Sequence, residues 1–249
     1  MAFLLANLLI AGCLLSNTQA AKSPNILIIL VDDVGTGDLP IYWNSSLVDM
    51  PNLQRLAEKG VMFTDAHANV VCAPSRYMLL SGNNPDRGTL PQGSWKLNFD
   101  KGSNQFLSNQ KSIAEVLSTA AGYTTGIFGK WHLGGGVPLK NDNSTKQENC
   151  LKFLTHEDHL WTTEPIINGP QDIGFDKSYI SIAGIQSGPY SFFQDGYLTT
   201  NKTDVVSWER GCYNASCGRS CIGSGDVSEG DASWDSSAYN QILVNETTK

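Results

Sequence analysis

The 249-residue sequence lacks an excess of positive charge and any internal repeat at solenoid spacing. Its 17 Lys and Arg residues stand against 24 Asp and Glu residues, which gives a formal net charge of −7. Without a basic field the chain has no surface for a nucleic acid, so any anion that it handles must be held by a few local cations and a metal. The hydrophobic fraction of 41% is sufficient for a packed core, which excludes a disordered chain.

Long hydrophobic segments are also lacking, because the apolar run over residues 1–15 is shorter than the roughly 20 residues that cross a bilayer. Small residues at 18–21 follow this run and suit cleavage by a signal peptidase. We therefore expect a signal peptide at 1–20, a mature chain at 21–249 in the secretory pathway, and no stable membrane insertion. A membrane anchor is the alternative, since the run has no basic residues before it.

Sequons and cysteines agree with export. Asn-X-Ser/Thr sequons without Pro in the middle occur at Asn44, Asn143, Asn201, Asn214 and Asn245. Loss of Cys13 with the signal leaves an odd number of cysteines, namely Cys72, Cys150, Cys212, Cys217 and Cys221. The cluster at 212–221 has no CxxC pair and no nearby histidine, so disulfides are a better interpretation than zinc. Four cysteines can pair in three ways, and the sequence does not select one.

The first half of the chain alternates between strand and helix patterns. Residues 25–31 form a short apolar run rich in β-branched residues, which predicts a central strand buried on both faces. Residues 51–60 begin with Pro and end with Gly, as a short helix does, and residues 61–66 resemble a second strand. A further helix is predicted over 74–80, which places Cys72 just ahead of a helix N-terminus.

Later segments continue the pattern less clearly. Ser112 and Glu115 have the spacing of a capping box, which predicts a helix that ends at Gly122 and a strand over 123–128. Residues 140–231 are polar and rich in glycine, and we interpret them as loops with small elements; residues 234–249 have helical spacing. This alternation predicts an α/β fold with a mostly parallel sheet flanked by helices.

Two adjacent carboxylates, Asp32 and Asp33, follow the first predicted strand. Open α/β sheets bind ligands outside the carboxyl ends of their strands, and calcium prefers oxygen ligands of this kind. The alternative is a pair that caps a helix or faces water.

Four ordered segments carry a resemblance to a known family. Residues 72–76, Cys-Ala-Pro-Ser-Arg, resemble the C-x-P-S-R signature of the sulfatase family, and residues 122–134 resemble its second signature. Residues 32–39 are similar to the family's first metal-binding segment, and Gly-Phe-Asp at 174–176 is similar to a later landmark. The four matches together indicate an N-terminal portion of a sulfatase.

The resemblance implies a fold of the alkaline-phosphatase type, truncated before its final strands. It implies that the formylglycine-generating enzyme converts Cys72 into formylglycine during maturation, which explains the odd cysteine. It also implies one Ca²⁺ ion held by Asp32, Asp33 and the modified residue 72, a substrate that is an aryl sulfate or a sulfated carbohydrate, and a secreted or lysosomal location.

Hydrolysis of a sulfate ester requires cations near the non-bridging oxygens, a nucleophile and an acid for the leaving group. Lys130, His132 and Arg76 are candidates for the cations and the acid, alongside Cys72. If extended geometry continues past the preceding strand, Lys130 and His132 point to one face because they lie two residues apart. Their structural alternatives are a surface lysine, a hydrogen-bonded core histidine and a surface cation on a helix.

Two departures from the family pattern keep other functions open. Ser-Gly-Asn at 81–83 replaces the common Thr-Gly-Arg, and the family's later metal ligands come from a region outside this chain. The fragment is therefore expected to be inactive by itself. The alternatives are a phosphate or phosphonate ester hydrolase of the same superfamily, and a non-catalytic secreted glycoprotein in which Cys72 remains a thiol or forms a disulfide.

Overall fold

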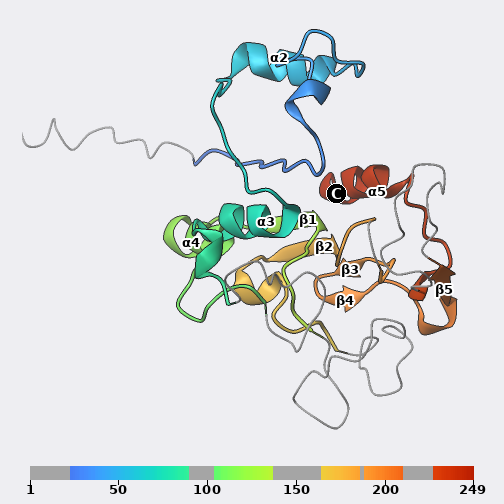
Figure 1. Ribbon diagram of the computed structural model, residues 1–249. Coiled ribbons are helices and arrows are strands. Elements are labelled where there is room, and N and C mark those ends of the chain that lie inside the picture. The colour runs from blue at the N-terminus through green and yellow to red at the C-terminus, as the bar shows by residue number, and fades with distance from the viewer. Residues whose placement is uncertain (1–22, 90–103, 137–163, 186–187, 210–226) are drawn as a thin grey trace, which may run out of the picture. The chain divides into compact units, whose positions relative to one another are not determined.

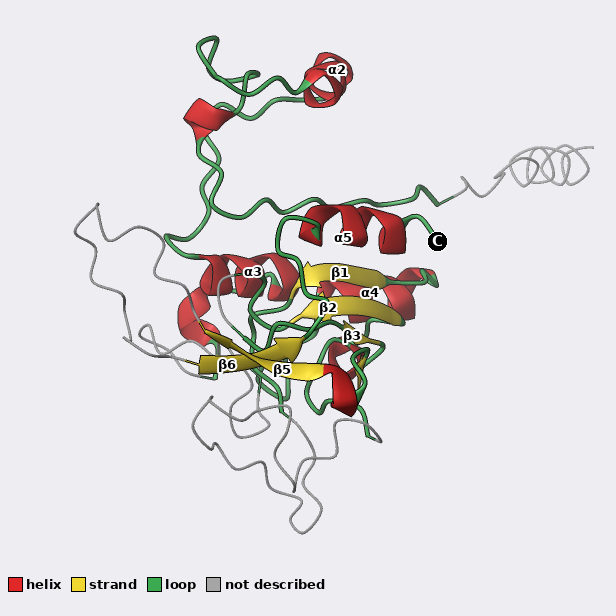
Figure 2. Cartoon of the chain, turned by 90° about the vertical axis from the view of Figure 1, so that its right-hand side faces the viewer, coloured by secondary structure: helices red, strands yellow, loops and turns green. Residues whose placement is uncertain are grey.

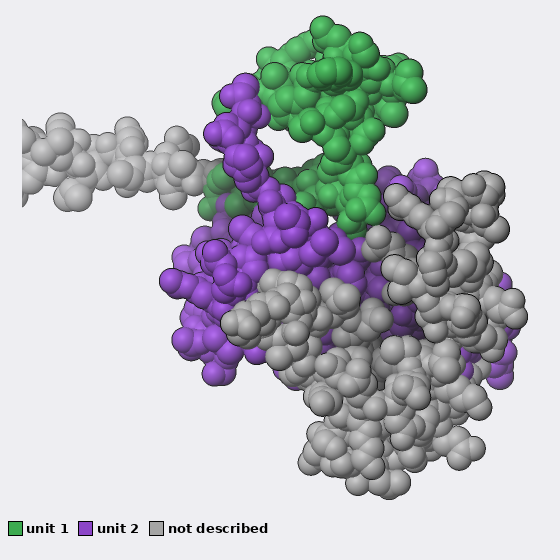
Figure 3. All heavy atoms as spheres, viewed as in Figure 1, with its two compact units in different colours: residues 1–62 green, residues 63–249 purple. Residues whose placement is uncertain are grey.

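The structure is a computed structural model that describes residues 23–89, 104–136, 164–185, 188–209 and 227–249. The chain divides into two compact units, residues 1–62 and residues 63–249, which Figure 3 colours separately. The expected signal peptide, the cysteines other than Cys72 and the sequons at Asn143 and Asn214 lie outside the described residues. Asn44, Asn201 and Asn245 are exposed.

In the first unit the helix predicted over 51–60 is confirmed as α2, Pro51–Lys59. Pro51 stands in the first turn, where its missing N–H costs no hydrogen bond, and Gly60 ends the helix. A short 3₁₀ helix, η1, covers Thr36–Asp38, and the N–H of Gly35 donates to Oδ2 of Asp38 at 2.8 Å.

The strand predicted over 25–31 is wrong. The segment forms no ladder, and Leu27 and Ile29 are each 75% exposed. A parallel strand is stable only beside neighbouring strands, and the described part of the first unit contains no other strand to pair with it. The strand predicted over 61–66 is absent as well, and Val61 is 83% exposed.

The described part of the second unit contains a four-stranded sheet in the order β1-β2-β3-β4; Figure 2 shows β1, β2 and β3 side by side. β1 (Gly126–Lys130) and β2 (Lys177–Ser181) run parallel, with Gly126 opposite Lys177 and Lys130 opposite Ser181. β3 (Phe193–Gln194) and β4 (Tyr197–Leu198) continue the sheet antiparallel. A separate antiparallel pair joins β5 (Val205–Glu209) to β6 (Val227–Asp231). The α/β fold is thus confirmed, with a mixed sheet in the described residues.

In the described part of the second unit, the α-helices beside the sheet are α3 (Cys72–Ser81), α4 (Ile113–Ala121) and α5 (Tyr239–Thr247), which Figure 1 labels. α3 packs on α4, and α5 packs on β1. Each helix was predicted from the sequence, although α3 starts at Cys72 and α5 starts later than residue 234. Short 3₁₀ helices cover Pro85–Arg87 (η2), Gln171–Ile173 (η4) and Lys202–Asp204 (η5).

One hydrophobic core joins these elements. Its fully buried members include Tyr77 of α3, Ile180 of β2, Phe193 of β3, and Trp131 and Leu133, which follow β1. The core therefore extends beyond the carboxyl end of β1, where the chain leaves the sheet. Among the described residues, no helix is both long and apolar enough to cross a bilayer.

Candidate active site

Cys72 is the first residue of α3, after Val71 as the N-cap in extended conformation. The hydroxyl of Ser75 donates to the carbonyl oxygens of Val71 at 2.9 Å and Asn69 at 3.1 Å, which fixes the chain entering the helix. Ala73 and Pro74 are buried, whereas Cys72 is half-buried. The thiol thus lies at the positive end of a helix dipole, where negative charge is favoured.

The carboxyl end of β1 supplies the side chains opposite this thiol. β1 ends at Lys130, but the ladder with the β2 segment continues, because Trp131 N donates to Ser181 O at 2.9 Å and His132 N donates to Ile182 O at 2.8 Å. His132 has a φ of 59°, in the left-handed region that few non-glycine residues adopt. The backbone bonds hold His132 in this uncommon conformation.

Lys130 and His132 converge on Cys72. Lys130 Nζ donates to Sγ of Cys72 at 3.4 Å, and His132 Nδ1 lies 3.2 Å from the same sulfur. Lys130 is 9% exposed and His132 is 8% exposed, so both polar groups are largely removed from water. Burial makes their electrostatic effect on an anion at residue 72 stronger than it would be at the surface.

Arg76 lies one turn after Cys72 on α3, and its Nη1 donates to the carbonyl oxygen of Lys130 at 2.7 Å. This charge-assisted bond joins the helix that carries the thiol to the strand that carries the ammonium. The guanidinium therefore helps to fix the backbone of Lys130, and it also adds a positive charge to α3.

Asp32 and Asp33 belong to the first unit, and both are exposed. Asp33 has a φ of 57°, so the chain turns sharply directly after the apolar segment. Among the described residues, no three His, Cys, Asp or Glu side chains gather into a group that could hold a metal. The carboxylate oxygens have the chemistry that calcium prefers, yet they form only part of a shell of 6–8 oxygens.

The Gly-Phe-Asp landmark lies where β1 and β2 begin. Oδ2 of Asp176 accepts from the backbone N–H of Thr125 at 2.7 Å and from its hydroxyl at 3.0 Å. These two bonds, in that order, hold the pKa of Asp176 below its ordinary value, with a smaller contribution from Lys177. Gly174 has a φ of 96°, and a Cβ at this residue would lie 2.8 Å from the backbone of Glu115. The landmark thus fixes α4 and the two parallel strands together.

The sequence did not predict the strand that supports the site. Ser181, the last residue of β2, and Ile182, which follows it, present carbonyl oxygens to Trp131 and His132. A weak signal was available, since Tyr179, Ile180 and Ile182 are of the aromatic and β-branched types that favour strands. The segment has no apolar–polar alternation, because Ser181 and Ala183 are buried as well, and so periodicity does not predict the strand.

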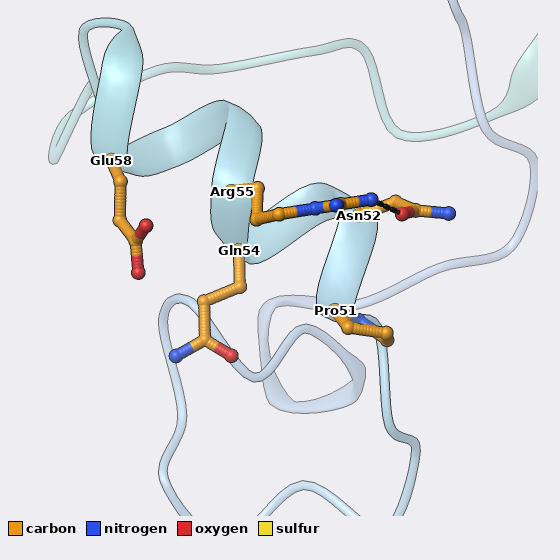
Figure 4. A pocket seen from close by; sticks show the side chains of 5 residues that line it. All are labelled: Pro51, Asn52, Gln54, Arg55 and Glu58. Atoms are coloured by element: carbon orange, nitrogen blue, oxygen red, sulfur yellow. Dashed lines mark hydrogen bonds between the residues drawn. The ribbon is translucent and has the colours of Figure 1, made fainter.

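A shallow depression on α2 is a different kind of feature, shown in Figure 4. It is lined by Pro51, Asn52, Gln54, Arg55 and Glu58, which all belong to one helix. Arg55 donates to Asn52 within it, as the dashed line shows. Groups from one exposed helix face do not enclose a substrate, so the convergent side chains at Cys72 are the better candidate site.

Comparison with known proteins identifies relatives of this chain. N-acetylgalactosamine-6-O-sulfatase of Bacteroides thetaiotaomicron is 34% identical over 201 residues, which are 78% of this chain and 34% of that protein. Bovine arylsulfatase A is 44% identical over 124 residues, which are 49% of this chain and 24% of that protein. The chain thus spans about a quarter to a third of the length of these curated relatives.

A solved structure has the same fold. It comes from work on glycosaminoglycan metabolism by Bacteroides thetaiotaomicron and has a TM-score of 0.59 at 24% identity, covering 87% of this chain and 45% of that one. The family profile described as Sulfatase matches residues 24–183, which include the Cys72 helix, β1 and β2. Because this match extends over more than half of the sequence, the chain belongs to the sulfatase family.

Proposed function

We propose that this chain is the N-terminal portion of an enzyme that hydrolyses sulfate esters, either aryl sulfates or a sulfated carbohydrate. The observation that carries the proposal is the convergence of Lys130 Nζ and His132 Nδ1 on Cys72 Sγ, at 3.4 and 3.2 Å. A sulfate ester is an anion, and a buried cation beside a nucleophilic position at a helix N-terminus suits it. Relatives named arylsulfatase and N-acetylgalactosamine-6-O-sulfatase support both substrate classes.

In this proposal Cys72 is a precursor. The formylglycine-generating enzyme of the secretory pathway oxidises its side chain to an aldehyde, and the Sγ atom of the structure stands in for the oxygens of the hydrated aldehyde. The proposal agrees with a half-buried thiol at the start of α3, which has no disulfide partner among the described residues. A hydroxyl in place of this sulfur lies within reach of both Lys130 and His132.

Asp32 and Asp33 are proposed as ligands of one Ca²⁺ ion, together with the modified residue 72. Their carboxylates fit the hard-oxygen preference of calcium, and the remaining ligands come from elsewhere in the complete protein. When bound, the ion supplies positive charge that favours the deprotonated nucleophile and neutralises the sulfate group.

Residues of this chain bind the sulfate group, remove a proton at residue 72 and hold Lys130 in position. The Lys130 ammonium binds a non-bridging sulfate oxygen and stabilises the charge that develops there, since it donates into the space beside residue 72. His132 removes a proton from the side chain at residue 72 through Nδ1, which faces that position. Arg76 holds the carbonyl oxygen of Lys130 and adds a positive charge to the helix that carries residue 72. The leaving alcohol takes its proton from Lys130 or from an acid outside this chain.

Mass spectrometry of the tryptic peptide 60–76 tests the modification. Protein from its native secretory pathway should carry formylglycine at residue 72, and sulfatases of the same cells provide the positive control. A peptide that contains only cysteine, in cells whose other sulfatases are modified, would contradict the proposal.

Turnover by the full-length protein tests the reaction. Cys72→Ala should abolish hydrolysis of an aryl sulfate, because it removes the nucleophile, and sulfatase activity retained by this variant would sink the mechanism. A matched aryl phosphate separates the neighbouring possibility: higher kcat/KM for the phosphate than for the sulfate would assign the chain to the phosphate or phosphonate ester hydrolases of the superfamily.

A further inference from the structure

We propose that Gly184 is a positioning residue for Lys130: its lack of a side chain lets the lysine stem lie where the ammonium reaches residue 72. This inference rests on the role that the proposed function gives to Lys130. Gly184 follows β2 by three residues and has no place in the four sequence segments that resemble the family.

The contact is close and specific. A Cβ on Gly184 would lie 3.2 Å from Cδ of Lys130, 3.5 Å from its Cγ and 3.6 Å from its Cβ. Three carbons of the lysine stem therefore lie along the face of this glycine. The φ of Gly184 is 69°, so the backbone also adopts a conformation that suits glycine best.

Other contacts leave Lys130 little freedom to adjust. Its carbonyl oxygen accepts from Arg76 at 2.7 Å, and its backbone pairs with Ser181 in the β1–β2 ladder. Its side chain is largely buried, and Nζ donates to Cys72 Sγ at 3.4 Å. Because backbone and ammonium are both held, a methyl group on Gly184 would have to displace the methylenes between them.

The same segment also fixes the second polar group. Ile182, two residues before Gly184, accepts the backbone N–H of His132 at 2.8 Å. The chain after β2 therefore sets the backbone of the histidine through a hydrogen bond and the stem of the lysine through a missing side chain. A small change at Gly184 should move the ammonium while the backbone of His132 keeps its partner.

The test compares Gly184→Ala with Gly122→Ala in the full-length protein with formylglycine at residue 72. Gly122 is the matched control because its φ is 66° and nothing lies within 4 Å of an added Cβ, so it has similar backbone strain without the lysine contact. Since misplacement of a charged group by a fraction of an ångström weakens transition-state contacts, Gly184→Ala should lower kcat/KM for a sulfate ester about tenfold, mainly through kcat. Gly122→Ala should change it less than twofold.

A double-mutant cycle separates positioning from a general loss of structure. Lys130→Ala removes the methylenes that the added methyl group would displace, so Gly184→Ala should have no further effect on kcat in that background. A tenfold loss that persists in the Lys130→Ala background would overturn the inference, as would equal activities of the Gly184 and Gly122 variants.

A crystal structure of full-length Gly184→Ala provides a readout that does not depend on activity. The distance from Lys130 Nζ to the side chain of residue 72 should exceed the distance in the parent protein, and an unchanged distance would overturn the inference. If the lysine moves but Lys130→Ala itself leaves turnover unchanged, the positioning holds and the role proposed for Lys130 fails.

Discussion

At the scale of single residues, the backbone of His132 determines the geometry of the site. The sequence predicted that Lys130 and His132 share a face if extended geometry continues past the strand that precedes them. Instead β1 ends at Lys130, and His132 has a φ of 59° while its N–H bonds Ile182. Both side chains still reach Cys72, but through a turn of the backbone that a strand pattern does not predict.

Replacing His132 should separate its chemistry from its conformation. Asn tolerates the left-handed region but cannot take a proton, so His132→Asn should fold with nearly unchanged Tm and lose about 10²- to 10³-fold in kcat. Thermal melts and sulfate-ester turnover measure the two effects. His67→Asn is the control, because His67 is exposed and pairs only locally with Asp65, and it should keep parental kcat. Parental turnover by His132→Asn would refute the proton-transfer role.

Asp176 should make stability depend on pH. Its folded pKa is lowered by the two Thr125 hydrogen bonds, so its stabilising contribution is present above the unfolded pKa of about 3.9 and is lost as the pH falls through the folded value. Asp176→Asn should therefore unfold at lower urea concentration than the parent at pH 7, with a gap that shrinks below about pH 4. Exposed Asp86 provides the control variant, Asp86→Asn. A gap that stays constant between pH 7 and pH 3 would exclude the carboxylate as its source.

At the scale of elements, α4 approaches the start of β2 so closely that Gly174 has no room for a side chain. A methyl group there would lie 2.8 Å from the backbone of Glu115, and the φ of 96° adds strain. Gly174→Ala should thus lower the free energy of unfolding by about 3 kcal/mol, against about 1 kcal/mol for Gly122→Ala, whose added methyl group meets open space. Urea titrations of both variants give the comparison, and equal losses would show that the close approach is relieved at no cost.

Helices were easier to predict from the sequence than strands, because their ends carry local signals. Gly82 and Gly122 terminate α3 and α4 in left-handed conformation, and the hydroxyl of Ser112 accepts from Glu115 N at 3.0 Å, as half of the predicted capping box. Strands depend on partners distant in sequence. The apolar run 25–31 therefore predicted a strand that does not form. β2 was not predicted, because it lies in a polar, glycine-rich segment without a clear hydrophobic period.

At the scale of the whole molecule, the candidate site joins segments about 60 residues apart in the chain. The family signatures identified Cys72, Arg76, Lys130 and His132, and the structure shows that their contacts connect α3 with β1. Composition could not reveal the distances, since they depend on the parallel ladder between β1 and β2. It did indicate that a chain of net charge −7 must hold an anion with local cations, and Lys130 is a buried cation at the candidate site.

The burial of α3 also has a consequence for biosynthesis. Ala73 and Pro74, which follow Cys72 in the signature, are inaccessible once α3 has packed, so a maturation enzyme that recognises the signature must act before that step. Folded protein in the thiol form should remain unmodified when it is incubated with the formylglycine-generating enzyme, whereas a synthetic peptide of residues 60–76 should be oxidised. Mass spectrometry measures both conversions. Equal conversion of the folded protein and the peptide would show that oxidation does not have to precede the packing of α3. Under the proposed function, folding and oxidation compete in time, and their relative rates during synthesis set the fraction of active molecules.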